Sequence, residues 1–166
     1  MLNPFEIFEI PVNFKIDKEY LSKKFIELQK LYHPDNFINS DVAQKTIALN
    51  KATDINQSYK ILLDPIRRAI SIIELNKGEL EVQSNSDMEF LMSQMEKREY
   101  LDSILDDLDK LEEFEEESEK DFITNTNLLE ESFKVNNFEE AKSYVDKLQF
   151  IQKLTKEIQI AIDKLD

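Results

Sequence analysis

Cysteine is absent from the 166 residues, and histidine occurs once. Without a thiol the chain can form no disulfide, no thiolate metal site and no cysteine nucleophile. A zinc or iron site would have to rest mostly on carboxylates, which is an improbable ligand set for those metals. One Gly and four Pro are too few turn residues for an all-β fold. We therefore expect no metal, no cofactor and no strand-rich fold.

Long hydrophobic runs are missing as well. No apolar stretch approaches the roughly 20 residues that cross a membrane. The first residues, MLNPFEIFEIPVNF, carry acidic side chains and no basic segment, so they do not have the pattern of a signal peptide. We expect a soluble intracellular protein that contacts no membrane.

Basic charge is scarce in the second half of the chain. The first 80 residues carry equal numbers of acidic and basic side chains, so the whole net charge of −14 lies in residues 81–166. Such a surface repels nucleic acid and anionic lipid. Two interpretations remain: a surface that attracts a basic partner, or a solvated helical surface kept soluble by repulsion.

The abundance of Leu, Lys, Glu, Ile and Asp favours an all-α fold. Asn3 before Pro4 predicts a short helix over 4–8, and Asp17 is the expected N-cap of a second helix. Apolar residues recur on one face of the second helix and on one face of a third, which begins after residue 40 or 41. These residues are Leu21, Phe25, Leu28 and Tyr32, then Ala48, Ala52, Ile55, Tyr59 and Leu62.

Asp64-Pro65 predicts the end of the third helix and the start of a fourth, which should close near Gly78. The polar stretch GELEVQSNS (78–86) is typical of a linker, so we expect domains at 1–77 and 87–166. The second domain should contain helices over roughly 87–112, 115–135 and 138–165, with the acidic run EEFEEESEKD (112–121) at the first turn. Helices of this length with short loops favour an antiparallel three-helix bundle.

The single histidine lies in LYHPDNF (31–37), where Pro34 must end the second helix. Four interpretations are possible: a His33–Asp35 catalytic dyad, a metal ligand, a helix stop with solvated neighbours, or an exposed tip that docks a partner. A dyad lacks a Ser, Cys or Thr nucleophile nearby, and the chain has no glycine-rich phosphate loop. We therefore expect a protein that is not an enzyme.

HPD between two amphipathic helices, followed by INQSYKILLDPIRRA (55–69), resembles the J-domain of DnaJ-type co-chaperones. The resemblance implies that His33, Pro34 and Asp35 activate the ATPase of a heat-shock-70-class chaperone. It also implies that Lys23, Lys24 and Lys30, which lie off the apolar stripe, meet an acidic surface of that chaperone. Glu27 interrupts this basic face and departs from the family pattern.

The second half departs from DnaJ itself, because no Gly/Phe-rich or cysteine-rich region follows. FLMSQMEKREYLD (90–102) and KLQFIQKL (147–154) resemble instead HscB, the co-chaperone family of iron–sulfur cluster biogenesis. This resemblance covers nearly the whole chain and implies two partners, an HscA/DnaK-like chaperone and an IscU-like scaffold protein. Eukaryotic relatives commonly add an N-terminal cysteine motif, so its absence favours a bacterial cytoplasmic protein.

The first helix of the second half has an independent feature. Its expected core stripe contains Leu101, Ile104, Leu105, Leu108 and Leu111. Met92 and Met95 project about 140–200° from that stripe, and Leu91 projects about 100° from it. Apolar residues opposite the core favour a binding patch, although a methionine stripe can also be core or contact the first domain.

The HscB resemblance implies that this patch binds the scaffold protein. The expected scaffold-binding residues are Leu91, Met92, Met95, Glu96, Glu99 and, on the last helix, Phe150. We interpret the chain as an adaptor that delivers the scaffold to the chaperone and stimulates ATP hydrolysis. The alternatives are a J-domain co-chaperone for a different client, a purely structural helical module, and an enzyme.

Overall fold

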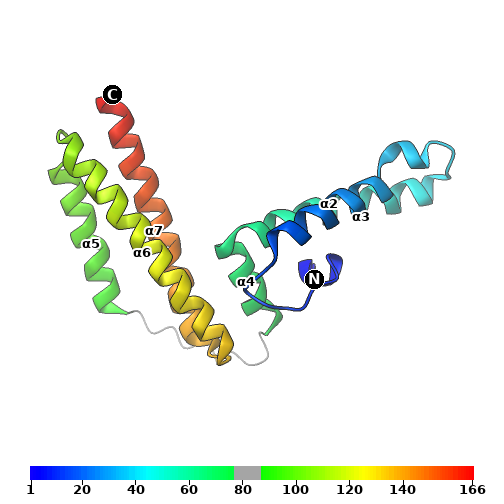
Figure 1. The fold of residues 1–166 in the computed structure, drawn as a ribbon, viewed down its shortest axis with the longest axis horizontal. Coiled ribbons are helices and arrows are strands. Elements are labelled where there is room, and N and C mark those ends of the chain that lie inside the picture. Colours follow the sequence, from blue (N-terminus) through cyan, green and yellow to red (C-terminus); the bar gives the residue numbers. More distant parts are fainter. Residues whose placement is uncertain (77–86) are drawn as a thin grey trace. The chain divides into compact units, whose positions relative to one another are not determined.

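This computed structural model describes residues 1–76 and 87–166, and the regular elements in these ranges are all helices (Figure 1). No strand occurs within those ranges. The chain divides into two compact units, unit 1 (Met1–Lys77) and unit 2 (Gly78–Asp166). The prediction of an all-α fold is confirmed. The linker expected at 78–86 lies outside the described residues.

Unit 1 is a helical hairpin supported by two shorter helices. Its elements are α1 (Pro4–Ile7), α2 (Lys18–Leu31), the 3-10 turn η1 (Pro34–Phe37), α3 (Val42–Leu63) and α4 (Pro65–Leu75). The expected caps are present: Asp17 accepts from two backbone N–H groups of α2, and Asp64 accepts from two of α4. Each cap satisfies donors that a helix start leaves without an intrahelical partner.

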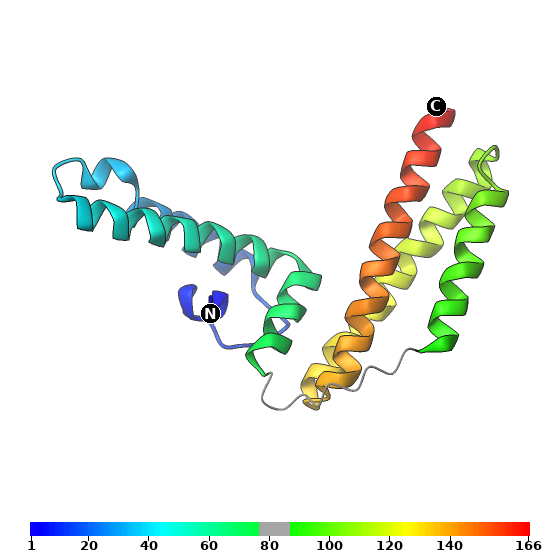
Figure 2. The same cartoon turned by 180° about the vertical axis from the view of Figure 1, so that it is seen from behind.

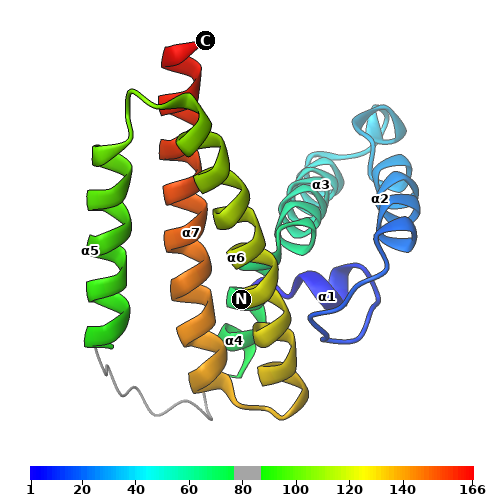
Figure 3. The same ribbon diagram turned by 60° about the vertical axis from the view of Figure 1, so that its left-hand side comes forward.

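The core of unit 1 lies where α1 and α4 meet the hairpin of α2 and α3. The two hairpin helices run side by side in both views (Figures 1 and 3). Phe5, Phe8 and Leu21 are fully buried there, and Phe25 of α2 stacks on Tyr59 of α3 with ring centroids 3.9 Å apart. The stripes predicted on α2 and α3 therefore face each other and hold the far end of the hairpin away from the core.

Unit 2 is an antiparallel three-helix bundle, as expected, formed by α5 (Met88–Ser103), α6 (Leu108–Lys134) and α7 (Phe138–Leu165) (Figures 2 and 3). α6 and α7 pack along their length, and α5 lies against this helical pair. One cluster of buried side chains joins all three helices; it contains Leu101, Ile104, Leu111, Phe114, Leu154, Ile158 and Ala161.

The predicted boundary between the first two helices of unit 2 was wrong. α5 ends at Ser103, and α6 begins at Leu108. Asp107 caps α6 by accepting from the Lys110 N–H, a local signal that outweighs the acidic run expected to form the turn. That run lies inside α6 with its carboxylates mostly exposed to water. Leu105, expected in the core stripe, belongs to the turn and is exposed.

Within the acidic run, the pKa of one carboxyl group, that of Glu115, is raised. Burial raises the pKa of Glu115, and the neighbouring carboxylates of Glu119, Asp163 and Glu112 raise it further. In the described part of the chain, this run included, no three or more His, Cys, Asp or Glu side chains gather as a metal site would need. No helix within the described ranges is long and apolar enough to cross a membrane.

Candidate binding surfaces

The far end of the unit 1 hairpin is a rigid turn built around Pro34. The backbone of His33 is extended, with φ −63° and ψ 136°, as expected for a residue before proline. Its ring Nδ1 accepts from the Asp35 N–H at 3.2 Å and caps η1. The amide of Asn36 donates to the Lys30 carbonyl at 2.6 Å, which ties the turn back to the end of α2.

These hydrogen bonds decide how His33 is presented. A nitrogen that accepts a hydrogen bond carries no proton, so the neutral ring bears its hydrogen on Nε2. Asp35 Oδ2 lies 3.6 Å from the same Nδ1, too far for a hydrogen bond. A catalytic dyad needs the reverse arrangement, with Nδ1–H donating to the carboxylate. The tip therefore presents Nε2 of His33 and the exposed carboxylate of Asp35 to a partner. The two side chains do not form the hydrogen-bonded pair of a catalytic dyad.

A groove of about 860 Å³ opens beside the tip, between α2 and α3. Ile26 and Ala52 contribute apolar surface to it, while Lys30, His33 and Asp35 line its polar end. Ile26 is half-exposed. The tip residues therefore border a surface that can take both an apolar segment and a charged group of a partner.

The three lysines expected on the basic face have different surroundings. Lys23 is exposed and pairs with Glu19, one turn earlier on the same helix, at 3.1 Å. Lys24 is 14% exposed and bonds Glu9 at 2.6 Å, with Glu27 at 3.8 Å. The hydrogen bond to Glu9 raises the Lys24 pKa. Lys24 thus joins α2 to the segment after α1, while Lys23 and Lys30 keep their charge available.

In unit 2 the outward face of α5 is apolar. Leu91, Met92 and Met95 are 43%, 58% and 64% exposed, which agrees with their predicted projection away from the core. Glu96 and Glu99 are exposed on the same helix. No described side chain of unit 2 covers the two methionines to any large extent, so this face can receive a partner without any change in the bundle.

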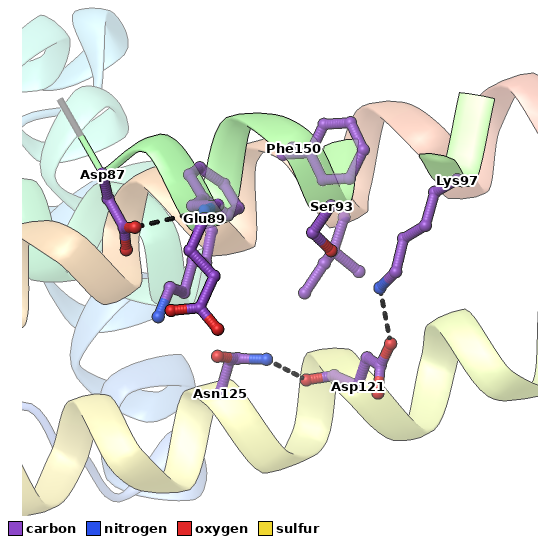
Figure 4. A pocket seen from close by; sticks show the side chains of 10 residues that line it. Asp87, Glu89, Ser93, Lys97, Asp121, Asn125 and Phe150 are labelled. Carbon is purple, nitrogen blue, oxygen red and sulfur yellow. Dashed lines mark hydrogen bonds and ion pairs between the residues drawn. The ribbon is translucent and has the colours of Figure 1, made fainter. Parts of the chain in front are cut away.

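Phe150 lies differently from the α5 residues. It is partly buried at the junction of α5 and α7 and packs against the core cluster of unit 2. The Phe90 ring meets it edge-on at 6.0 Å, and the Arg98 guanidinium lies 5.5 Å above it. Phe150 lines a cleft together with Ser93 and Lys97 of α5, and all three are drawn in Figure 4. Phe150 therefore reaches the α5 side of the bundle. Its side chain is less exposed to solvent than those of Met92 and Met95.

Sequence reasoning did not find the ion pairs that Lys97 and Arg98 of α5 form with the two other helices of unit 2. Their partners, Asp121 and Glu157, are 24 and 59 residues away, so no local spacing connects them. Asn36 was also missed, although an Asn directly after HPD is a residue type that commonly bonds to nearby backbone.

A helical hairpin with an exposed HPD turn, joined in one chain to an acidic three-helix bundle, defines the class of J-domain co-chaperones with a helical second domain. The comparisons with known proteins agree. Residues 86–159 match the family described as "HSCB C-terminal oligomerisation domain". The co-chaperone protein HscB homolog of Haemophilus influenzae is 40% identical over 164 residues, which cover 96% of this chain and 94% of that protein.

Two solved structures are similar over nearly the whole chain. The chaperone HscB from Vibrio cholerae is 34% identical, with a TM-score of 0.88 and 99% of both chains covered. The human co-chaperone protein HscB is 25% identical, with a TM-score of 0.84, 95% of this chain and 81% of that chain covered. The chain belongs to the HscB family of co-chaperones.

The exposure of the methionines leads to a stability prediction. We expect Met92→Ala/Met95→Ala to melt close to the wild type, because both side chains are mostly in water. Leu101→Ala on the same helix, where the side chain is 6% exposed, should cost about 2–5 kcal/mol. Denaturant unfolding followed by circular dichroism measures both. A methionine variant that loses as much stability as Leu101→Ala would show that this face is part of the core.

Proposed function

We propose that this protein is an adaptor in iron–sulfur cluster assembly. Unit 1 binds an HscA/DnaK-like chaperone of the heat-shock-70 class and stimulates its ATPase, and unit 2 binds an IscU-like scaffold protein and brings it to that chaperone. One observation carries the proposal: two separately folded units each expose a surface suited to a protein partner. Family membership supports both assignments, and the bacterial relative supports a bacterial cytoplasmic location.

The unit 1 surface suits a partner of mixed character. Asp35 is exposed for an ion pair with a basic group, and Nε2 of His33 can donate a hydrogen bond. The neighbouring groove provides apolar contact. Because Pro34 and the bonds to Lys30 and Asp35 already fix the turn, little conformational entropy is lost when it docks, and pre-organisation of this kind strengthens binding.

Lys23 and Lys30 serve a different purpose in this proposal. Exposed charges on a docking face steer encounter and mainly change the association rate. The positive charge of Lys24 is balanced by the carboxylates of Glu9 and Glu27, so Lys24 contributes little to the electric field of this face. The chaperone surface that meets this face should therefore be acidic, with its main contacts near the tip.

The unit 2 surface suits an apolar partner segment with a basic edge. Methionine side chains adapt to irregular surfaces, and Glu96 and Glu99 lie beside Met92 and Met95 along α5. Neither unit contains a thiol or a glycine-rich phosphate loop, so the proposal gives the protein no bond-making chemistry of its own. The scaffold carries the cluster, and the chaperone hydrolyses ATP.

A J-domain co-chaperone that serves a different client remains the second candidate. The observation that favours it is the acidic surface of unit 2, since α6 alone carries the run EEFEEESEKD, which would attract a basic client of any class. The two candidates share unit 1 and differ only in what binds unit 2.

Substitutions at the tip should change the activity of the protein but not its stability. His33→Gln and Asp35→Asn should each abolish stimulation of the chaperone ATPase, because each removes a group aimed at the partner. Exposed substitutions change stability by about 0.5 kcal/mol or less, so the melting curves should stay close to the wild type. Single-turnover ATP hydrolysis measures the effect, with Asp102→Asn in unit 2 as control. Undiminished stimulation by either tip variant would contradict the proposal.

The lysine prediction concerns association rate. Lys23→Glu and Lys30→Glu should slow chaperone binding, and raising salt from about 50 to 500 mM should slow the wild type in the same way, because salt screens exposed charges. Lys24→Gln should change the rate less and stability more, since it breaks the link to Glu9. Surface plasmon resonance gives the rates. Kinetics independent of salt would rule out electrostatic steering.

The client prediction concerns affinity. Met92→Ala and Met95→Ala should each weaken scaffold binding by about 1–2 kcal/mol, several-fold to about thirtyfold. Leu91→Ala and Phe150→Ala should deepen the defect, and changes at Glu96 or Glu99 should have smaller effects.

Calorimetry of the scaffold protein against each variant measures this loss. Ile123→Ala is the matched control, because Ile123 is a similarly exposed apolar residue, 61% exposed, on α6. Undiminished scaffold binding by Met92→Ala/Met95→Ala would show that the scaffold binds another face of unit 2, whereas a wild-type protein that does not bind the scaffold would favour the second candidate.

A further inference from the structure

Helix α5 is attached to the rest of unit 2 mainly at its two ends. Near the C-terminal end Leu101 is the buried residue of the helix. Near the N-terminal end Phe90 touches Phe150 edge-on. Between them a cleft of about 440 Å³ separates α5 from the α6–α7 pair, with the polar side chains of Ser93 and Asn125 in its lining (Figure 4). Apolar contact in the middle of α5 is therefore incomplete.

Two adjacent ion pairs cross this middle section. Lys97 Nζ lies 3.0 Å from Asp121 Oδ2 on α6, drawn as a dashed line in Figure 4. Arg98 donates to Glu157 Oε2 on α7 at 2.7 Å. Neighbouring residues on a helix project about 100° apart. The two pairs therefore hold α5 from two directions, one toward each partner helix, and together they fix its rotation about its own axis.

Arg98 has a second contact. Its guanidinium lies 5.5 Å above the Phe150 ring, within the range of a cation–π interaction. One side chain on α5 thus contacts the aromatic residue on α7 that is expected to share the client surface. Rotation of α5 would separate the two parts of that surface.

We propose that Lys97 and Arg98 are positioning residues for client binding, and that their ion pairs keep the apolar face of α5 turned outward. A slip of one residue would turn Met92 and Met95 about 100° toward a flank of the bundle. This inference rests on the proposed function, because it takes the scaffold protein as the client of unit 2. All four ionic side chains are about one-third exposed, so each pair adds little to global stability and acts chiefly on orientation.

The experiment uses the full chain, with calorimetry against the IscU-like scaffold protein. Lys97→Asp and Asp121→Lys should each weaken binding about five- to tenfold, at most about 1.4 kcal/mol. Each single variant places two like charges opposite one another, at positions 97 and 121. The double variant Lys97→Asp/Asp121→Lys restores the pair and should recover most of the affinity. Glu157→Gln, which keeps the size of the side chain, should weaken binding in the same direction.

The matched control is Lys120→Ala. Lys120 pairs with Glu116 of the same helix, at 3.8 Å, so its loss changes a surface charge without releasing α5. Its affinity should stay within about twofold, less than 0.5 kcal/mol. Circular dichroism confirms that each variant is folded. Unchanged affinity in folded Lys97→Asp and Glu157→Gln would overturn the inference, as would a double variant that binds no better than its single parents.

A second measurement needs no scaffold. Methyl NMR of methionine-labelled protein should show the Met92 and Met95 signals shift in Lys97→Asp and return in the double variant, with Met1 of unit 1 as internal reference. Methyl signals that stay in place would contradict the positioning role. If the wild type fails to bind the scaffold, the proposed function fails, while these methyl shifts still test whether the ion pairs orient α5.

Discussion

Proline at position 34 is the constraint on which the unit 1 surface depends. Its ring holds His33 out of the helical region and removes one backbone donor, so α2 must end there. His33 and Asp35 are then free of the helix, and the nearby bonds to Lys30 and Asp35 hold the turn in one shape. Stacking of Phe25 on Tyr59 holds α2 against α3, so the turn at the end of this hairpin stays away from the core of unit 1.

In unit 2, the residues that we propose bind the scaffold protein are apolar and yet lie outside the core. The buried cluster at the C-terminal end of α5 and the cross-helix ion pairs allow this. Only a small part of α5 is used for the core, so Met92 and Met95 can face water. The wider acidic surface keeps such an exposed patch soluble, since net charge opposes self-association.

Local signals were enough to predict most of the fold. Asn3, Asp17, Asp64 and the HPD turn each act within one helical turn, and the helices they delimit were predicted closely. The α5–α6 boundary was missed because two local signals competed there, the Asp107 cap and the acidic run. The exposure of Leu91, Met92 and Met95 followed from helical periodicity alone. The ion pairs of Arg98 and Lys97 were not predicted, since their partners come from distant helices, and Lys24 pairs with a residue 15 positions away.

In the function that we propose, one chain couples client arrival to ATP hydrolysis. Single-turnover hydrolysis by the chaperone, at a limiting concentration of this protein, tests it directly by comparing rates with and without the scaffold. The account predicts that the scaffold raises the rate further with the wild type but not with Met92→Ala/Met95→Ala, whose stimulation without scaffold stays normal. An equal response to scaffold by both proteins would contradict it.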